Sequence, residues 1–308
     1  MTCGVNASTV RFLNTEPFMS LLISKDDRDF EVRSKPLRAD IPRRRWMAAG
    51  LLQVALALGH PLRAGAQPVK PVRLLAASDL KFALALVLER FQTETGHKVE
   101  ATFGSSGSFA QQIQQGLPAD LFMSADEDFV YKLADAGLTR MVTNAAGQSP
   151  DRGALYAVGR IAFYVPSNST IELDAGLNGL KAQWSQVSKF AIANPEHAPY
   201  GRAAREALQK LGLWEMVLPK LVMGENISQA TQFVATGAAQ AGITALSLAL
   251  APEVARSGRH LALPASLHAP LRQRMVLLKS ATPAAVALYD YLQAAVAREI
   301  LRGYGFSM

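Results

Sequence analysis

Cysteine is almost absent from the 308-residue chain, whose single cysteine, Cys3, lies close to the N-terminus. The rest of the chain therefore has no disulfide, no thiolate metal site and no cysteine nucleophile. Charged residues are also scarce, at 19% against 49% hydrophobic residues, which excludes a disordered or fibrous chain. No apolar run reaches the ~18 residues of a membrane span. These absences leave a globular protein with enough chain for about two domains.

Basic charge is not concentrated on the part of the chain that forms the body of the protein. The formal net charge is +7. Residues 1–66 hold ten Lys or Arg against six Asp or Glu, whereas residues 67–308 hold twenty-two against nineteen. A protein that follows a phosphate backbone needs clustered Lys and Arg, and residues 67–308 have no such cluster. We therefore expect no nucleic-acid partner.

The sequence also lacks the usual patterns of metal ligands and catalytic nucleophiles. His197 follows Glu196, but no second His or Cys lies at ligand spacing, so we expect no metal held by the protein and no cofactor. The histidines after residue 66 form no recognised catalytic motif. A serine-dependent hydrolase that uses Ser106 remains an alternative, and it requires a His or Lys base within reach of that hydroxyl.

The N-terminal region predicts export from the cytoplasm. Arg43–Arg45 precede an apolar stretch over 46–58, and Ala64–Ala66 form an A-x-A cleavage site. Residues 43–66 are therefore predicted to be a signal peptide, which places the mature protein in the periplasm. Ordinary secretion is favoured over twin-arginine export because the residues after the arginines fit that signal poorly. Residues 1–42 show no sustained period, and we expect a disordered extension or a segment upstream of the true start.

Short apolar runs alternate with helical patterns from Gln67 onward. Ser108 and Gln111 form a capping box for one helix, and the long run 155–165 is expected to connect two lobes. The alternation predicts an α/β fold with mostly parallel sheets. Strands are predicted over 72–77, 99–103, 117–125, 155–165, 190–193, 241–245, 261–263 and 274–278, and helices over 80–95, 108–116, 126–136, 201–211, 226–236, 246–255 and 283–302.

Polar turns follow predicted strands and open predicted helices. The turns over 76–79 and 104–108 offer hydroxyls and glycines, and neither contains Lys or Arg. Free backbone N–H groups at a helix N-terminus favour an anion. The turns over 194–201 and 224–230 also open helices. Each turn by itself is better explained as a cap or loop, but four together indicate a compact anion site built from neutral donors.

Six segments resemble the periplasmic molybdate-binding proteins of ABC importers, and the resemblance extends over residues 70–308. The segments are Ala76–Leu80, Phe103–Gly107, Gln112–Asp126, Asn194–Gly201, Glu225–Ile227 and Arg302–Phe306. The resemblance implies the two-lobed, type II periplasmic-binding-protein fold with two crossing hinge strands. The first lobe would comprise 67–153 and 270–308, and the second lobe 154–269. It further implies a non-enzymatic protein that captures molybdate or tungstate and delivers it to a membrane permease, and we expect a monomer.

The family's oxyanion-binding positions fall on Ser78, Asp79, Ser106, Tyr200 and Ile227. Ser78 and Ser106 would contribute hydroxyl groups, and Tyr200 and Ile227 would contribute backbone N–H groups. An ionised Asp79 side chain would repel a dianion. We therefore expect Asp79 to contribute only its N–H, with the carboxylate turned toward the helix over 80–95.

One position departs from the family pattern. Many members place a tyrosine hydroxyl on the ligand after the strand that here reads Gly242-Ile243-Thr244, and this chain has Ala245 there. The loss of that donor leaves the preference among oxyanions open. Another oxyanion or a small anion is therefore the alternative ligand.

Overall fold

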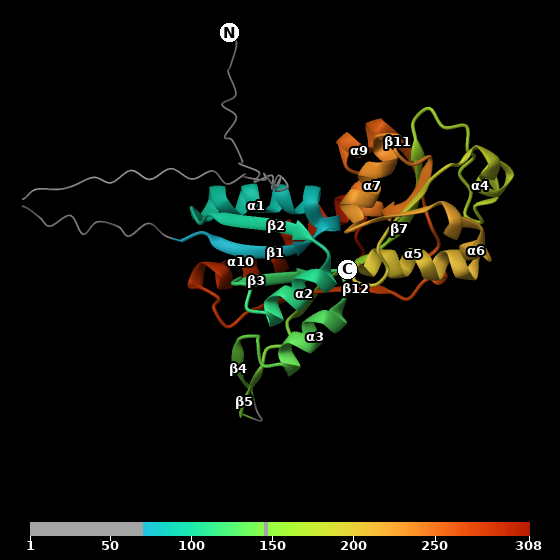
Figure 1. Cartoon of the computed structure of the whole chain (residues 1–308). Coiled ribbons are helices and arrows are strands. Elements are labelled where there is room, and N and C mark those ends of the chain that lie inside the picture. Colours follow the sequence, from blue (N-terminus) through green and yellow to red (C-terminus); the bar gives the residue numbers. More distant parts are fainter. Residues whose placement is uncertain (1–69, 145–146) are drawn as a thin grey trace, which may run out of the picture. The chain divides into compact units, whose positions relative to one another are not determined.

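The computed structural model describes residues 70–144 and 147–308. The predicted N-terminal extension 1–42, with Cys3, and the predicted signal peptide 43–66 lie outside the described residues. In the two described ranges, no helix is both long and apolar enough to cross a lipid bilayer. The described chain forms two lobes, each built on a five-stranded mixed sheet with helices on both faces (Figure 1).

The first sheet has the strand order β2-β1-β3-β12-β6. β1 (Val72–Ala77) lies between β2 (Val99–Gly104) and β3 (Leu121–Ser124) and pairs in parallel with both. On the other side of β3, β12 (Leu271–Leu277) pairs antiparallel with β3 and with β6 (Ala154–Gly159). The parallel strands are the ones that the sequence places before the polar turns, so their carboxyl ends bring those turns together.

Two hydrophobic layers cover the first sheet because successive side chains of a strand face opposite sides. Leu74 of β1 belongs to one layer and Leu75 to the other, and both side chains are buried. The first layer contains α1 (Lys81–Thr95), α10 (Pro283–Gln293) and α11 (Ala295–Gly303), and the second contains α2 (Ser106–Gln114) and α3 (Glu127–Asp135).

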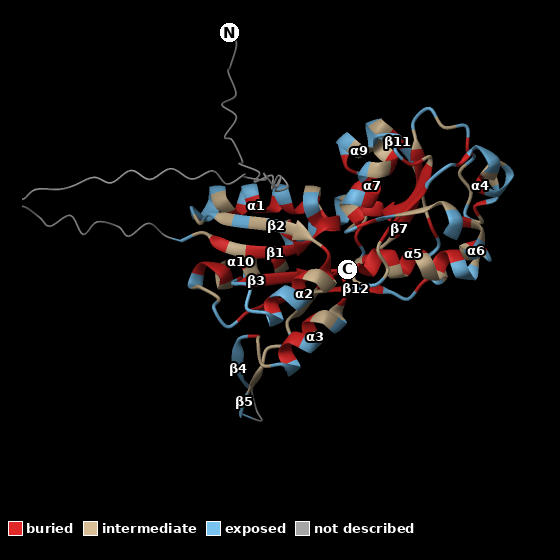
Figure 2. Cartoon of the chain, in the orientation of Figure 1, coloured by how far each residue is buried: buried red, intermediate tan, exposed pale blue. Residues whose placement is uncertain are grey.

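The second sheet has the strand order β11-β7-β10-β8-β9, which repeats the pairing pattern of the first. Its strands are β7 (Ile161–Pro166), β8 (Phe190–Ala193), β9 (Leu221–Gly224), β10 (Ala241–Ala245) and β11 (Gly258–Ala262). The pairings β10·β8 and β8·β9 are parallel, and those of β7 are antiparallel. The strands β1, β3 and β7 are largely buried, whereas the helices expose one side (Figure 2).

Helices pack on both faces of the second sheet, and short elements complete the fold. The helices are α4 (Asn178–Ala182), α5 (Pro199–Lys210), α6 (Trp214–Val217), α7 (Ile227–Ala235), α8 (Leu246–Ala249) and α9 (Pro252–Ser257). The short elements are the hairpin β4 (Met141–Asn144) and β5 (Gly147–Pro150) and the 3-10 turns η1 (Ser78–Leu80), η2 (Trp184–Gln186), η3 (Leu218–Lys220) and η4 (Ala265–Leu267).

The chain crosses between the two sheets at Arg160 and again between β11 and β12. The single long strand expected over 155–165 is in fact two strands, β6 in the first sheet and β7 in the second. The crossing therefore lies one strand beyond the expected lobe boundary after Gly153. The other expected boundary, at 269/270, falls inside the connection from β11 to β12.

Several helix boundaries differ from the sequence prediction. The capping box of Ser108 and Gln111 is wrong, because α2 begins at Ser106 and Ser105 occupies the N-cap position. The helix expected over 246–255 is two helices, since Ala251 precedes Pro252 and adopts an extended conformation. The helix expected over 283–302 is likewise interrupted, at Ala294. Its start is confirmed, because the Thr282 hydroxyl accepts a hydrogen bond from the N–H of Ala285 at 3.2 Å.

Candidate anion-binding site

A small cavity lies between the lobes, where several helices begin. Its volume is about 10 Å³, roughly the space of a single water molecule and far below the ~300–1,000 Å³ typical of sites for drug-sized ligands. The five predicted oxyanion-binding residues all line it, although they come from four separate turns. The lining residues are Ala77, Ser78, Asp79, Gly104, Ser105, Ser106 and Ala125 from the first lobe and Ala198, Pro199, Tyr200, Asn226 and Ile227 from the second.

Helix N-termini account for this convergence. Ser78 opens η1, which runs into α1, and Ser106 opens α2. In the second lobe, Tyr200 lies in the first turn of α5 and Ile227 opens α7. The first N–H groups of a helix have no acceptor within the helix, and the helix dipole gives that end partial positive charge. Both lobes therefore present neutral donors to the cavity.

Ser78 and Ser106 are buried, with 2% and 1% of their surface exposed. The hydroxyl of Ser106 accepts a hydrogen bond from the N–H of Ala125 at 2.9 Å. The hydroxyl of Ser78 accepts one from the N–H of Ser228, across the cleft, at 3.3 Å. Because these bonds use only the oxygen, each hydroxyl still has its hydrogen to donate.

The Asp79 carboxylate does not turn toward the helix that follows it, so that expectation is wrong. Its Oδ2 accepts hydrogen bonds from the Tyr200 hydroxyl at 3.0 Å and from Nε2 of Gln273 at 2.7 Å. Its Oδ1 is buried and has no hydrogen-bond partner among the described residues. Burial disfavours the ionised form and raises the pKa of Asp79 from its ordinary value of 3.8 to about 6.

The two tyrosines beside Asp79 are neutral over the physiological range. Burial and the negative charge of Asp79 raise the pKa of Tyr200 and of Tyr156 well above 10. The Tyr156 hydroxyl donates to the backbone carbonyl of Ser124 at 3.1 Å. Neither tyrosine therefore adds charge to the site.

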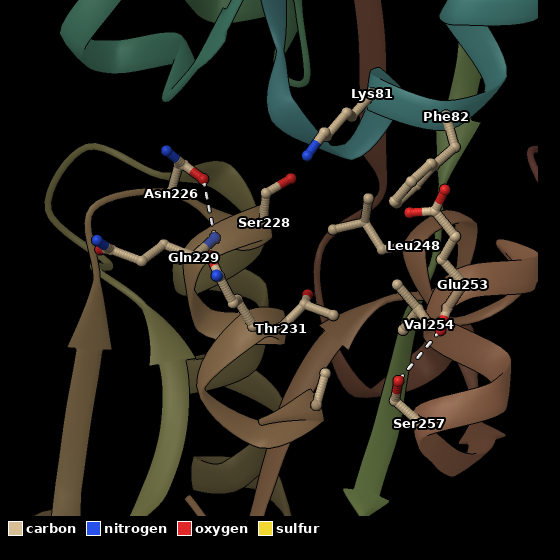
Figure 3. A pocket seen from close by; sticks show the side chains of 12 residues that line it. Lys81, Phe82, Asn226, Ser228, Gln229, Thr231, Leu248, Glu253, Val254 and Ser257 are labelled. Atoms are coloured by element: carbon tan, nitrogen blue, oxygen red, sulfur yellow. Dashed lines mark hydrogen bonds between the residues drawn. The ribbon is translucent and has the colours of Figure 1, made fainter. Parts of the chain in front are cut away.

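No cationic side chain lines the small cavity, as far as the described residues extend. Arg202, which lies on α5, forms an ion pair with Asp126 across the cleft. A second cavity of about 430 Å³ shares Asn226 with the first and is lined by one cation, the exposed Lys81, and one acid, Glu253. Figure 3 shows Lys81 reaching from α1 toward Ser228 of α7. Within the described part of the chain, the anion site therefore offers neutral donors and no countercharge, and Asp79, which also lines it, is an acid.

Hydrogen bonds join the lobes around the cavity. The backbone carbonyl of His197 accepts from the N–H of Gly107 at 2.9 Å and from the Ser105 hydroxyl at 2.5 Å. Opposite this contact, the Ser228 hydroxyl donates to the carbonyl of Ser78 at 2.8 Å. The lobes are thus in contact in this structure, and residues next to the predicted positions make the contacts. Sequence reasoning missed Ser105, Ser228 and Gln273 because nothing local distinguishes them from ordinary caps and strand residues.

The hydrolase alternative requires a base beside the Ser106 hydroxyl. His197 instead lies next to two other serines, with Nδ1 3.0 Å from the Ser105 oxygen and 3.4 Å from the Ser108 oxygen. Within the described ranges, the partner of Ser106 is a backbone N–H rather than a base. No group of three His, Cys, Asp or Glu side chains in those ranges is placed to hold a metal ion.

Two mixed α/β lobes with two crossings and a cavity between them define a two-lobed, type II periplasmic-binding-protein fold. Residues 72–307 match the family described as bacterial extracellular solute-binding proteins, and the chain belongs to that family.

Within this broad family, the chain is similar to molybdate-binding proteins, both in sequence and in structure. The molybdate-binding protein of Azotobacter vinelandii is 36% identical over 264 residues, which covers 85% of this chain and 100% of the relative. The molybdate-binding protein of Rhodobacter capsulatus is 37% identical and covers 84% of this chain and 96% of the relative. The solved periplasmic molybdate-binding protein of Azotobacter vinelandii superimposes with a TM-score of 0.68 at 26% identity, covering 77% of this chain and 99% of that structure.

Proposed function

We propose that the protein captures molybdate or tungstate between its lobes and delivers it to the membrane permease of an ABC importer. Ser78, Asp79, Ser106, Tyr200 and Ile227 bind the oxyanion, the serines through their hydroxyls and the others through backbone N–H groups. The protein acts without catalysis, because capture requires only that the closed state bind the anion more tightly than the open state.

One observation carries this proposal. Four helix N-termini from two lobes meet at one cavity, and the side chains that line it include no Lys or Arg among the described residues. A site of this kind suits a small anion that is held by directed hydrogen bonds. The similarity to molybdate-binding proteins over most of the chain supports the choice of ligand.

The number of hydrogen bonds that such a site can make to the anion suffices for tight binding. About five to seven bonds to a charged group, at roughly 1.5–3 kcal/mol each, give on the order of 10–20 kcal/mol before the costs of desolvation and closure. A net free energy of about 8–12 kcal/mol corresponds to micromolar to nanomolar dissociation constants. Neutral dipoles therefore meet the energetic requirement without a countercharge.

Selectivity is expected to follow the size of the anion. Fixed donors reach a tetrahedral anion at one radius only, so the smaller sulfate leaves some hydrogen bonds long. Protonated phosphate needs an acceptor in the pocket, and Asp79, which lines the cavity and whose Oδ1 has no hydrogen-bond partner among the described residues, is a candidate for it. Another oxyanion therefore remains the alternative ligand, and Ala245, which supplies no hydroxyl, leaves the ratio of molybdate to tungstate open.

Isothermal titration of the full chain with molybdate, tungstate, sulfate and phosphate tests the proposal. We expect molybdate and tungstate to bind with micromolar or tighter dissociation constants and sulfate to bind at least tenfold more weakly. Sulfate binding as tight as molybdate binding would contradict the proposed specificity. Phosphate as the tightest ligand would favour the alternative.

Delivery to a permease implies that the protein works outside the cytoplasm. The family consists of extracellular solute-binding proteins, and the predicted signal peptide 43–66 provides the route of export. We propose that the mature protein is a periplasmic monomer. Fractionation of cells that produce the full chain tests this, with the mature protein expected in the periplasmic extract and its first residue at Gln67.

A further inference from the structure

Asp79, Tyr200 and Gln273 form a buried hydrogen-bonded cluster that joins the two lobes. Tyr200 belongs to the second lobe, and Asp79 and Gln273 belong to the first. The Tyr200 hydroxyl donates to Oδ2 of Asp79 at 3.0 Å, and Nε2 of Gln273 donates to the same oxygen at 2.7 Å. Nε2 of Gln273 also lies 3.0 Å from the Tyr200 oxygen. No more than 2% of the surface of any of the three residues is exposed.

The cluster lies where the chain crosses between the sheets. Gln273 is on β12, at the point where the register of β12 against β6 shifts, between Gln273 and Arg274. Gly159 is the last residue of β6, directly before the crossing at Arg160. A Cβ at position 159 would collide with the Tyr200 oxygen and with Nε2 of Gln273. Glycine at this position therefore makes room for the cluster beside the hinge.

The hydrogen bond from Tyr200 to Asp79 exists only while the lobes are together. The same two residues are also proposed to hold the anion through their backbone N–H groups. We propose that the Asp79 carboxylate and the Tyr200 hydroxyl form a latch, braced by Gln273, that holds these two N–H groups in register on the anion and slows its release. The inference rests on the proposed function. Asp79 and Tyr200 act here as positioning residues, through side chains that do not themselves contact the anion.

A latch affects dissociation rather than association. The anion enters an open cleft in which the bond is not yet formed, so the association rate is independent of the Tyr200 hydroxyl. Release requires the lobes to separate, which breaks the hydrogen bond between the Tyr200 hydroxyl and Oδ2 of Asp79. The other groups that face Asp79 are the Tyr156 ring from β6 and the Ser247 hydroxyl from α8, which donates to the Asp79 carbonyl at 2.8 Å. Neither of them bridges the carboxylate to the second lobe.

Tyr200→Phe isolates the latch because it removes the hydroxyl and keeps the backbone N–H. Tyr164→Phe is the matched control, since Tyr164 is equally buried and its hydroxyl donates to the carbonyl of Val254 within the second lobe. Stopped-flow measurements on the full chain give the association and dissociation rates of molybdate. We expect Tyr200→Phe to raise the dissociation rate by roughly tenfold or more, with an association rate within about threefold of wild type. Tyr164→Phe is expected to leave both rates unchanged.

Equal dissociation rates for Tyr200→Phe and Tyr164→Phe would overturn the latch. A double-mutant cycle with Asp79→Ala, measured in saturating molybdate, provides a second test, because the bond between the two side chains forms only while the lobes are together. In thermal unfolding, we expect the double variant to be no less stable than the less stable of the two single variants. If the losses of stability in the two single variants simply add in the double variant, the latch is overturned. A wild type that fails to bind molybdate would contradict the proposed function, whereas a wild type that binds molybdate but releases it no more slowly than Tyr200→Phe does would overturn the latch alone.

Discussion

Asp79 places a buried carboxyl group beside a cavity that is proposed to hold an anion. Its Oδ2 accepts hydrogen bonds from Tyr200 and Gln273, and its Oδ1 has no hydrogen-bond partner among the described residues. An asparagine side chain would keep the carbonyl oxygen in the place of Oδ2 and put an uncharged amide in the place of Oδ1. The negative charge of Asp79 therefore destabilises the folded protein, whereas the shape of its side chain places an acceptor oxygen for Tyr200 and Gln273.

The pH dependence of stability follows from this charge. Because the folded pKa of Asp79, about 6, lies above the unfolded value of 3.8, the folded protein binds more protons between these values. The cost of the charge is therefore fully present above pH 6 and is relieved as the pH falls toward 4. We predict that the free energy of unfolding of Asp79→Asn exceeds that of wild type by roughly 2–3 kcal/mol at pH 7.5, so that the variant unfolds at a higher temperature, and that the difference shrinks at pH 4.5. Calorimetric melting at both pH values measures it, and an equal difference at both would refute the explanation.

The serine hydroxyls give a second prediction at this scale. Ser78→Ala and Ser106→Ala are each expected to weaken molybdate binding by about 1–3 kcal/mol, because each removes a donor to a charged ligand. Glu196→Ala is the control, since the Glu196 side chain is exposed and pairs with Arg205 on the surface. Isothermal titration of the three variants compares them directly. Equal losses in all three would show that the site residues are wrongly assigned.

At the scale of single residues, the sequence predicts which residues line the site but not the direction of each side chain. Ser78 and Ser106 could be predicted because a polar turn between a strand and a helix is visible locally. The direction of the Asp79 side chain could not, because its partners are 121 and 194 residues away in the chain. A local rule about charge repulsion indicated the wrong direction, since it considered the anion and left out Tyr200 and Gln273.

At the scale of elements, the start of α2 contacts the other lobe directly. The N–H of Gly107 donates to the carbonyl of His197, and a Cβ at position 107 would lie 2.5 Å from that oxygen. That oxygen belongs to the backbone of the other lobe and cannot rotate away as a side chain could, so the clash can be relieved only if the lobes separate.

We therefore predict that Gly107→Ala impairs closure. Molybdate affinity is expected to fall at least tenfold, because the first turn of α2 and the residues around Tyr200 no longer reach the anion together. Gly303→Ala, where a Cβ meets open space, is the control and is expected to bind as wild type does. Small-angle scattering with saturating molybdate would show a larger radius of gyration for Gly107→Ala. A variant that closes and binds normally would refute the role of this contact.

The elements themselves were largely predictable, and their pairing was not. Alternating apolar runs and helical periods indicated β1, α1, β8 and α7 within a few residues. The run over 155–165 is apolar on both sides of Arg160, so its pattern does not reveal that β6 and β7 join different sheets. The change of sheet is determined by which strands are available to pair, and those strands are distant in the sequence.

For the whole molecule, the account holds that the anion is bound without a countercharge. Lys81 lines the neighbouring cavity and is the cation that tests this claim. We predict that Lys81→Gln changes the molybdate dissociation constant by less than about threefold at physiological salt, because an exposed charge is screened by the solvent. Lys98→Gln, at the opposite end of β2 from the site turns, controls for the loss of one charge. A loss of thirtyfold or more in Lys81→Gln alone would identify Lys81 as the missing countercharge.

A crystal structure of the protein with molybdate, with the metal located by its anomalous scattering, tests the central claim most directly. The account predicts electron density for the anion among the first turns of η1, α2, α5 and α7, with the hydroxyls of Ser78 and Ser106 and the N–H groups of Tyr200 and Ile227 directed at its oxygens. A lysine or arginine nitrogen within about 4 Å of those oxygens, or serine side chains turned away from the anion, would contradict it.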